Sequence, residues 1–70
     1  MTIKLLASAS TEDGIIKMIN IYFCYSKNYI LMWENETHTK AMVWNNKLGK
    51  SLDGFRVVHK GARYRFERLK

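Results

Sequence analysis

The chain has 70 residues, a net charge of +6, 47% hydrophobic and 13% aromatic residues, and no proline. Seventy residues suffice for one small domain and are too few for two, so residues 1–70 are treated as a single domain. This hydrophobic and aromatic content excludes simple disorder, and the composition also excludes collagen-like and disulfide-stapled classes.

Cysteine usage indicates a reducing compartment. Cys24 is the only cysteine, so no internal disulfide can form, and its place in the apolar run 21–25 predicts a buried, unreactive thiol. We therefore expect a cytoplasmic location. The apolar stretch Leu5–Leu6 is too short for a signal peptide, and polar residues interrupt the most apolar segment, 15–33, so no membrane association is predicted.

The first third of the chain contains an ambiguous segment. Residues 2–9 predict a first short element, and residues 10–14 predict a turn or the start of a helix capped by Ser10. The run 15–25 shows both helical spacing and strand-like alternation. Its four isoleucines and three aromatic residues favour a strand, and the alternative is one helix near residues 11–25.

The middle of the chain predicts two antiparallel strands. Residues 26–28 are expected to form a hairpin loop, and residues 29–33 are apolar at every position, which is typical of a strand buried on both faces. Residues 39–45 predict the returning strand, and residues 46–53 predict a polar link that contains at most one short helical turn. Together these patterns predict a mostly β domain of five or six short antiparallel strands in a curled sheet or small barrel. The alternative is an α+β domain with the helix described above.

Residues 54–69 predict a closing hairpin with two unlike faces. If Lys60-Gly61 is a two-residue loop, the aromatic side chains gather on one face and Arg56 opposes Arg65 on the other. A loop one residue longer would mix the two sets, so the hydrophobic pattern favours the shorter loop. Because arginines directly opposite each other repel, this register requires a neighbouring acid such as Glu67 or a bound anion.

Positive charge is concentrated at the C-terminal end. Residues 55–70 carry six basic residues against one acid, a net +5, whereas residues 1–54 carry six against five, a net +1. All four arginines lie in the last fifteen residues, and the planar guanidinium group matches phosphate, so this hairpin is a candidate phosphate-binding track. The predicted contacts are Arg56, Lys60, Arg63, Arg65 and Arg68, with His59 and Lys70 as secondary contacts.

These features predict a small basic accessory protein that binds nucleic acid, either DNA or RNA. The alternative is a protein-interaction module, such as a small inhibitor or adaptor, that docks its arginines on an acidic partner. Charged side chains on a strand also keep a sheet edge soluble without binding anything. A third functional interpretation is a metal-free ribonuclease, in which His59 beside Arg63 would act with His38 or Glu67.

We do not expect an enzyme from this sequence. No spacing of cysteine, histidine or acidic residues matches a zinc motif, and Gly49-Lys50-Ser51 lacks the earlier glycine of a phosphate-binding loop. We accordingly predict no metal and no cofactor.

Self-association is expected because residues 21–33 are more apolar than one small core can hide. A symmetric homodimer is the simplest arrangement. The predicted contact residues are Tyr22, Tyr29, Leu31 and Trp33.

Overall fold

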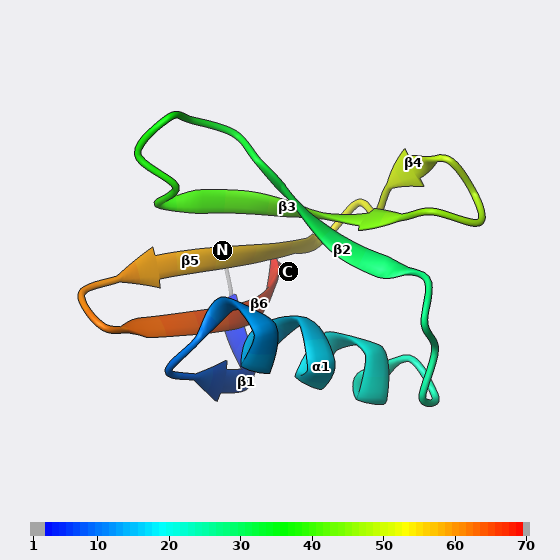
Figure 1. Cartoon of the computed structure of the whole chain (residues 1–70), viewed down its shortest axis with the longest axis horizontal. Helices are drawn as coiled ribbons and strands as arrows, with labels where there is room; N and C mark the ends of the chain where they lie inside the picture. The colour runs from blue at the N-terminus through cyan, green and yellow to red at the C-terminus, as the bar shows by residue number, and fades with distance from the viewer. Residues whose placement is uncertain (1–2, 70) are drawn as a thin grey trace.

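The computed structural model describes residues 3–69, which form one antiparallel sheet with a helix packed on one side (Figure 1). The strand order is β1-β6-β5-β3-β2, and β4 pairs with the end of β3. The predicted mostly β fold is confirmed: the described residues form six strands and one helix, and the sheet stays open and does not close into a barrel. The elements are β1 (Ile3–Ala9), α1 (Glu12–Tyr22), β2 (Tyr29–Trp33), β3 (Lys40–Asn45), β4 (Lys50–Ser51), β5 (Phe55–Lys60) and β6 (Arg63–Leu69).

The apolar run at residues 15–25 is largely helical, so the favoured strand prediction is wrong and the helical alternative is confirmed. Ile15 and Ile19, four residues apart, are completely buried, which is the spacing of one helix face and not of alternation. The N-cap is Thr11 and not Ser10, because Thr11 Oγ1 accepts the backbone N–H three residues later at 3.0 Å. This cap starts the helix before the β-favouring residues, and burial of the isoleucines against the sheet outweighs their strand propensity.

The chain leaves α1 through an irregular connection and not through the expected hairpin loop at residues 26–28. Cys24 and Tyr25 both adopt left-handed backbone conformations, with φ of 62° and 60°. This turn directs the chain away from the core, so Cys24 is exposed and the prediction of a buried thiol is wrong. The run 21–25 looked continuous because its residues are apolar, but the helix ends at Tyr22 and divides it.

Strands β2 and β3 occupy the positions that the sequence predicts. β2 coincides with residues 29–33, and β3 begins one residue after the predicted start of its strand. One face of this apolar strand is uncovered in the single chain: Ile30 and Met32 are 38% and 40% exposed, while the residues between and beside them are half-buried. No layer covers the outer face of β2 within the described residues. The predicted link at residues 46–53 contains the two-residue strand β4 in place of a helical turn.

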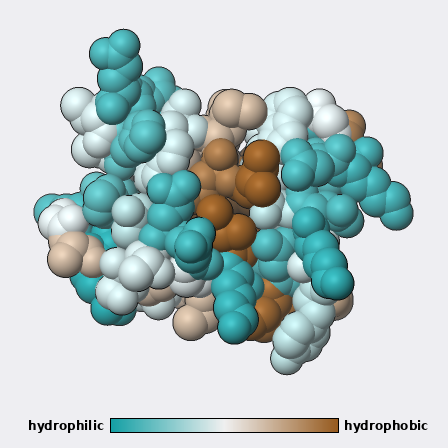
Figure 2. Space-filling model, in the orientation of Figure 1, coloured by the Kyte–Doolittle hydropathy of each residue, from teal (hydrophilic) through white to brown (hydrophobic). Residues whose placement is uncertain are grey.

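The core lies between α1 and the sheet. Val57 pairs with Phe66 on one side and with Ala41 on the other, and all three side chains are completely buried. The helix packs against β1, β6 and β2. In the view of Figure 1, hydrophobic side chains gather at the middle of the surface and hydrophilic ones surround them (Figure 2). The eleven-residue helix therefore covers the centre of the sheet, and apolar side chains next to the helix stay exposed to solvent.

The closing hairpin has its predicted faces but a different register. Lys60 pairs with Arg63, so the loop is Gly61-Ala62 and not Lys60-Gly61. Gly61 has a φ of 61°, a left-handed conformation that the first loop position of a tight hairpin requires and that lysine adopts only at a cost. The resulting shift is two residues, and because strand side chains alternate with a period of two, each face keeps its residues.

Candidate functional site

The face of the sheet opposite α1 carries most of the basic side chains of the closing hairpin. Cross-strand partners share a face, and successive residues of a strand point to opposite faces. The pair Val57–Phe66 is buried in the core under α1, so the cross-strand pairs on either side of it point the other way. We refer to the charged residues placed there as the basic sheet face: Lys40, Arg56, Lys60, Arg63, Arg65 and Glu67.

Lys40 is the member of this face that sequence reasoning missed. It lies at the start of β3, where it pairs with Val58 of β5 and so shares a face with the arginines. Alternation within residues 39–45 places Lys40 on one side of its own strand, but only the β3–β5 pairing shows which side faces the arginines. That pairing joins segments far apart in the chain, and no local signal in the sequence marks it.

Glu67 is held between two arginines. Its carboxylate accepts hydrogen bonds from Arg56 Nε at 2.8 Å and from Arg65 Nε at 3.1 Å, and its side chain is only 8% exposed. The predicted Arg56–Arg65 opposition is therefore wrong, because the observed register sets Arg56 opposite Glu67. The expected neutralising acid is Glu67 itself, so the repulsion that the sequence implied is relieved within the sheet.

The arginines of the basic sheet face keep donors for an outside partner. Arg56 and Arg65 reach Glu67 through Nε, and within residues 3–69 no hydrogen bond uses their terminal nitrogens. Arg63 donates from one terminal nitrogen to Ser8 Oγ at 2.8 Å. Because a guanidinium has five N–H donors, each of these side chains is fixed in position and still able to bind an anion.

The position of Glu67 makes the stability of the fold depend on pH. Burial alone would raise the pKa of this carboxyl, but the hydrogen bonds and positive charges of Arg56 and Arg65 outweigh burial, so its pKa lies below the ordinary value of 4.5. The ionised form is therefore bound more tightly in the folded chain than in the unfolded one. This contribution is complete above pH 4.5 and is lost as the pH falls through the lower pKa of the folded state.

We expect Glu67→Gln to lower the free energy of unfolding by about 1–2 kcal/mol at neutral pH, with the lower part of the range favoured because Arg65 is half exposed. The difference from wild type should shrink as the pH falls below 4.5. Urea unfolding at a series of pH values measures both effects. Glu36→Gln, at an exposed position in the β2–β3 connection, is the control and should track wild type at every pH. A Glu67→Gln deficit that is the same at pH 3 and pH 7 would contradict the assignment.

Arg68, a predicted contact, lies apart from the basic sheet face. It pairs with Phe55 and with Lys4, so it points to the side of the sheet on which α1 packs. It differs from Arg65 by an odd number of positions, and successive residues of a strand alternate between the two faces. Lys70 lies outside the described residues.

His59 is also on the helix side, where it belongs to an aromatic cluster. Its ring stacks on that of Tyr64, with 4.0 Å between centroids, and the ring of His38 stacks on Trp33 at 4.8 Å. His59 Nδ1 lies 3.1 Å from the carbonyl oxygen of His38. A carbonyl only accepts, so Nδ1 carries the proton and donates. The His59 ring thus contacts the backbone of His38. Arg63 points to the opposite face, so the sheet does not bring it beside His59 as the ribonuclease interpretation requires.

The residues predicted for self-association take part in the interior packing. Tyr29, Leu31 and Trp33 are half-buried and pack against the core, and Tyr22 is 44% exposed with its ring 5.5 Å from that of Phe66. The more exposed residues of β2 are those in between. Formation of a homodimer stays a prediction, which sedimentation at tens of micromolar would test.

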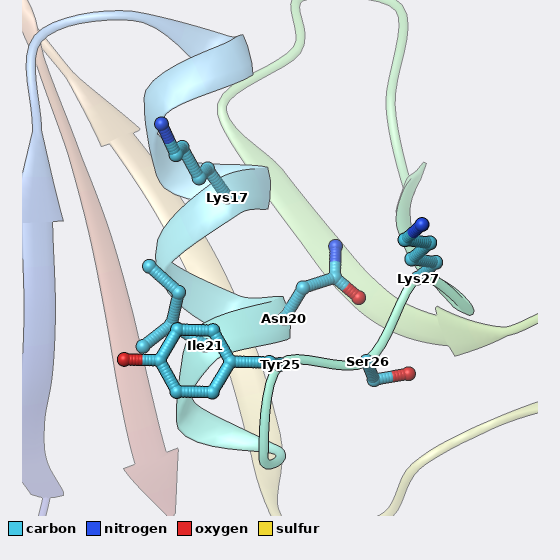
Figure 3. A pocket seen from close by; sticks show the side chains of 6 residues that line it. All are labelled: Lys17, Asn20, Ile21, Tyr25, Ser26 and Lys27. Atoms are coloured by element: carbon cyan, nitrogen blue, oxygen red, sulfur yellow. The ribbon is translucent and has the colours of Figure 1, made fainter.

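A cavity of about 300 Å³ lies where α1 ends (Figure 3). The helix and the connection that follows it each contribute three lining residues, and two of the six are lysines. Because these residues belong to the helix side, the cavity is separate from the basic sheet face. The lining residues are Lys17, Asn20, Ile21, Tyr25, Ser26 and Lys27.

Residues 3–69 contain no group of three or more histidine, cysteine or acidic side chains placed to hold a metal ion. Across the same residues, no helix has the length and apolar character needed to cross a membrane.

Comparison with protein-family models, with curated proteins and with solved structures finds no match to this chain.

Proposed function

We propose that this protein binds nucleic acid through the basic sheet face. The observation that supports the proposal is the charge imbalance on an uncovered sheet surface, where five cations accompany the single carboxylate of Glu67. A phosphodiester backbone presents closely spaced negative charges, and lysine and arginine side chains bind it by displacing its condensed counterions. Within the described residues, Glu67 pairs with Arg56 and Arg65, and no salt bridge engages Lys40, Lys60 or Arg63.

The ion pairs around Glu67 add to this argument because they hold two guanidinium groups in place. An arginine fixed by one bond loses less conformational freedom when a phosphate binds its remaining donors. A face that served only solubility would need no such fixation, since freely moving charges hydrate equally well. The Glu67 pairs therefore favour a binding surface over a merely solvated one.

An acidic protein is the alternative partner, because carboxylates also bind arginine in pairs of hydrogen bonds. Salt dependence alone does not separate the two partners. Direct binding to purified DNA and RNA does, because an acidic-protein adaptor need not bind either of them.

The test compares two variants that remove the same charge from different places. Lys40→Ala/Lys60→Ala/Arg63→Ala removes three exposed cations from the basic sheet face, and Lys17→Ala/Lys47→Ala/Lys50→Ala removes three exposed cations from elsewhere. Arg56 and Arg65 stay in both, because their removal would leave the buried Glu67 carboxylate unpaired. Each protein is stripped of carried-over nucleic acid and titrated with mixed-sequence DNA and RNA over a range of salt concentrations.

We expect wild type to bind with an affinity that falls steeply with salt. In a plot of the logarithm of the binding constant against the logarithm of salt concentration, the variant of the basic sheet face should have a slope smaller in magnitude by about 2 to 3. The control variant should keep the wild-type slope within about 1. Equal losses in the two variants would show that net charge, and not this face, determines binding. Absence of binding to DNA and RNA, together with recovery of one stoichiometric protein after nuclease treatment, would favour the acidic-protein alternative.

A further inference from the structure

The sheet surface opposite α1 has a cationic half, which is the basic sheet face, and an apolar half beside it. Strands β5 and β6 supply Arg56, Lys60, Arg63 and Arg65, with Lys40 at the start of β3 beside them. Further along β3, alternation places Met42 and Trp44 on the same face as Lys40. Met42 pairs with Met32 and Trp44 pairs with Ile30, so β2 extends the apolar half to the edge of the sheet.

The apolar half is open to solvent. Met42, Met32 and Ile30 are 38%, 40% and 38% exposed, although each is large and hydrophobic. Trp44 is half-buried among them and is the aromatic side chain that the described strands place on this face. A contiguous exposed apolar surface on a small domain marks a place where something else binds. Ile3 and Leu5 also point this way from β1, at the opposite border, but they offer no aromatic ring.

The arrangement matches a ligand that is anionic along one edge and apolar along the other. Neighbouring strands lie about 4.8 Å apart, so a polymer whose phosphates follow β5 and β6 has its other edge over β3 and β2. In single-stranded nucleic acid the base faces are free to stack on aromatic and apolar side chains. In a duplex the base faces are stacked on one another inside, and the surface beside one backbone presents a groove and then a second row of phosphates.

We propose that the sheet surface opposite α1 binds single-stranded nucleic acid in preference to duplex. The phosphates would lie on the basic sheet face and the bases on the apolar half around Trp44. The inference rests on the proposed function, since it specifies the ligand of the same face. A second chain of this protein is disfavoured as the occupant, because two copies meeting through this face would bring two sets of five cations together.

Trp44→Ala tests the apolar half without removing a charge. We expect wild type to bind a mixed-sequence single strand of about 12 nucleotides at least tenfold more tightly than a duplex of the same length. Trp44→Ala should weaken single-strand binding about tenfold and leave duplex binding within about twofold, because only the single strand stacks on the ring. The salt slope should stay at the wild-type value, because the phosphate contacts remain.

Matched variants keep the result interpretable. Trp44→Phe retains a ring and should keep single-strand affinity within about threefold of wild type, which measures stacking even if Trp44→Ala does not fold. Tyr25→Ala removes a ring that is 80% exposed at the end of α1 and should have no effect on either ligand. Circular dichroism establishes that each variant is folded before binding is measured.

Two results would overturn the inference while leaving the proposed function intact. One is salt-dependent binding of duplex as tight as that of the single strand. The other is a folded Trp44 variant that loses the same factor of affinity for the single strand and for the duplex. Failure of the proposed function is a separate outcome, in which wild type binds neither ligand at any salt concentration.

Discussion

Replacement of Phe66 by alanine will leave a large fraction of the molecules unfolded at 25 °C. The side chain is completely buried, and its ring centroid lies 5.5 Å from that of Tyr22 and 5.7 Å from that of Phe55. Truncation of a buried phenylalanine costs about 3–5 kcal/mol. A core of this size supplies a net stability of about 3–5 kcal/mol. Because the cost of this truncation is comparable to the free energy of unfolding of the whole domain, Phe66→Ala brings that free energy close to zero.

Urea unfolding followed by circular dichroism measures the loss. Phe66→Leu keeps most of the side-chain volume, should lose about 1.5 kcal/mol or less, and gives a measurable value if the alanine variant does not accumulate. Met18→Ala, at a position of α1 that is 43% exposed, should change the free energy of unfolding by less than about 0.5 kcal/mol. A Phe66→Ala protein that unfolds at the wild-type midpoint would place Phe66 outside the core.

Replacement of Asn20 by alanine will lower the free energy of unfolding by about 2 kcal/mol. Its side-chain amide donates to the carbonyls of Ile16 and Tyr29, at 3.0 and 3.2 Å, and its side-chain oxygen accepts the backbone N–H of Tyr29 at 3.0 Å. One side chain therefore joins the helix to the first residue of β2. Alanine leaves both backbone groups of Tyr29 without this partner in a partly buried position, and the cost of an unsatisfied buried group exceeds the value of the bond itself.

Asn46→Ala is the matched control for this prediction. Asn46 is exposed, and its recorded bond to the carbonyl of Asn28 uses the backbone N–H, at 2.7 Å, which alanine keeps. The control should unfold within about 0.5 kcal/mol of wild type in the same urea titration. If the Asn20 and Asn46 variants were equally stable, the amide of Asn20 would not hold α1 to the sheet.

The Asn20 bonds also explain how a strained connection persists. Two consecutive left-handed residues other than glycine, Cys24 and Tyr25, each cost of order 1 kcal/mol or more. The bonds of Asn20 to Tyr29, together with the bond from Ser26 N–H to the carbonyl of Asn20 at 2.9 Å, hold the connection closed at both ends.

Local sequence patterns predicted the secondary structure correctly in segments whose hydrophobic spacing fits only one element type. Residues 29–33 and 39–45 are short, mostly apolar segments bounded by polar turns, so they predicted β2 and β3 within one residue. The closing hairpin was found for the same reason. Its faces were right despite the wrong loop, because a shift of two residues preserves the alternation.

Local patterns failed where the deciding interactions come from distant parts of the chain. The run 15–25 satisfies both periodicities, and it becomes a helix because Ile15 and Ile19 pack against a sheet whose strands, apart from β1, all follow later in the chain. Cys24 was misplaced because the exact end of that helix decides whether the thiol points inward. Chain length did indicate that part of the apolar run 21–33 would stay uncovered, but which face of β2 is exposed depends on where α1 packs.

The sequence by itself determined the fold class, the positions of most strands, and the concentration of net charge in the last sixteen residues, because each follows from composition and short-range alternation. Only the tertiary structure decided what that charge becomes. It set Arg56 opposite Glu67, brought Lys40 beside the arginines, turned Arg68 to the other side, and placed Trp44 next to the cations. These outcomes depend on the register and pairing of strands. Both are properties of two segments together, and the sequence of one segment alone does not predict them.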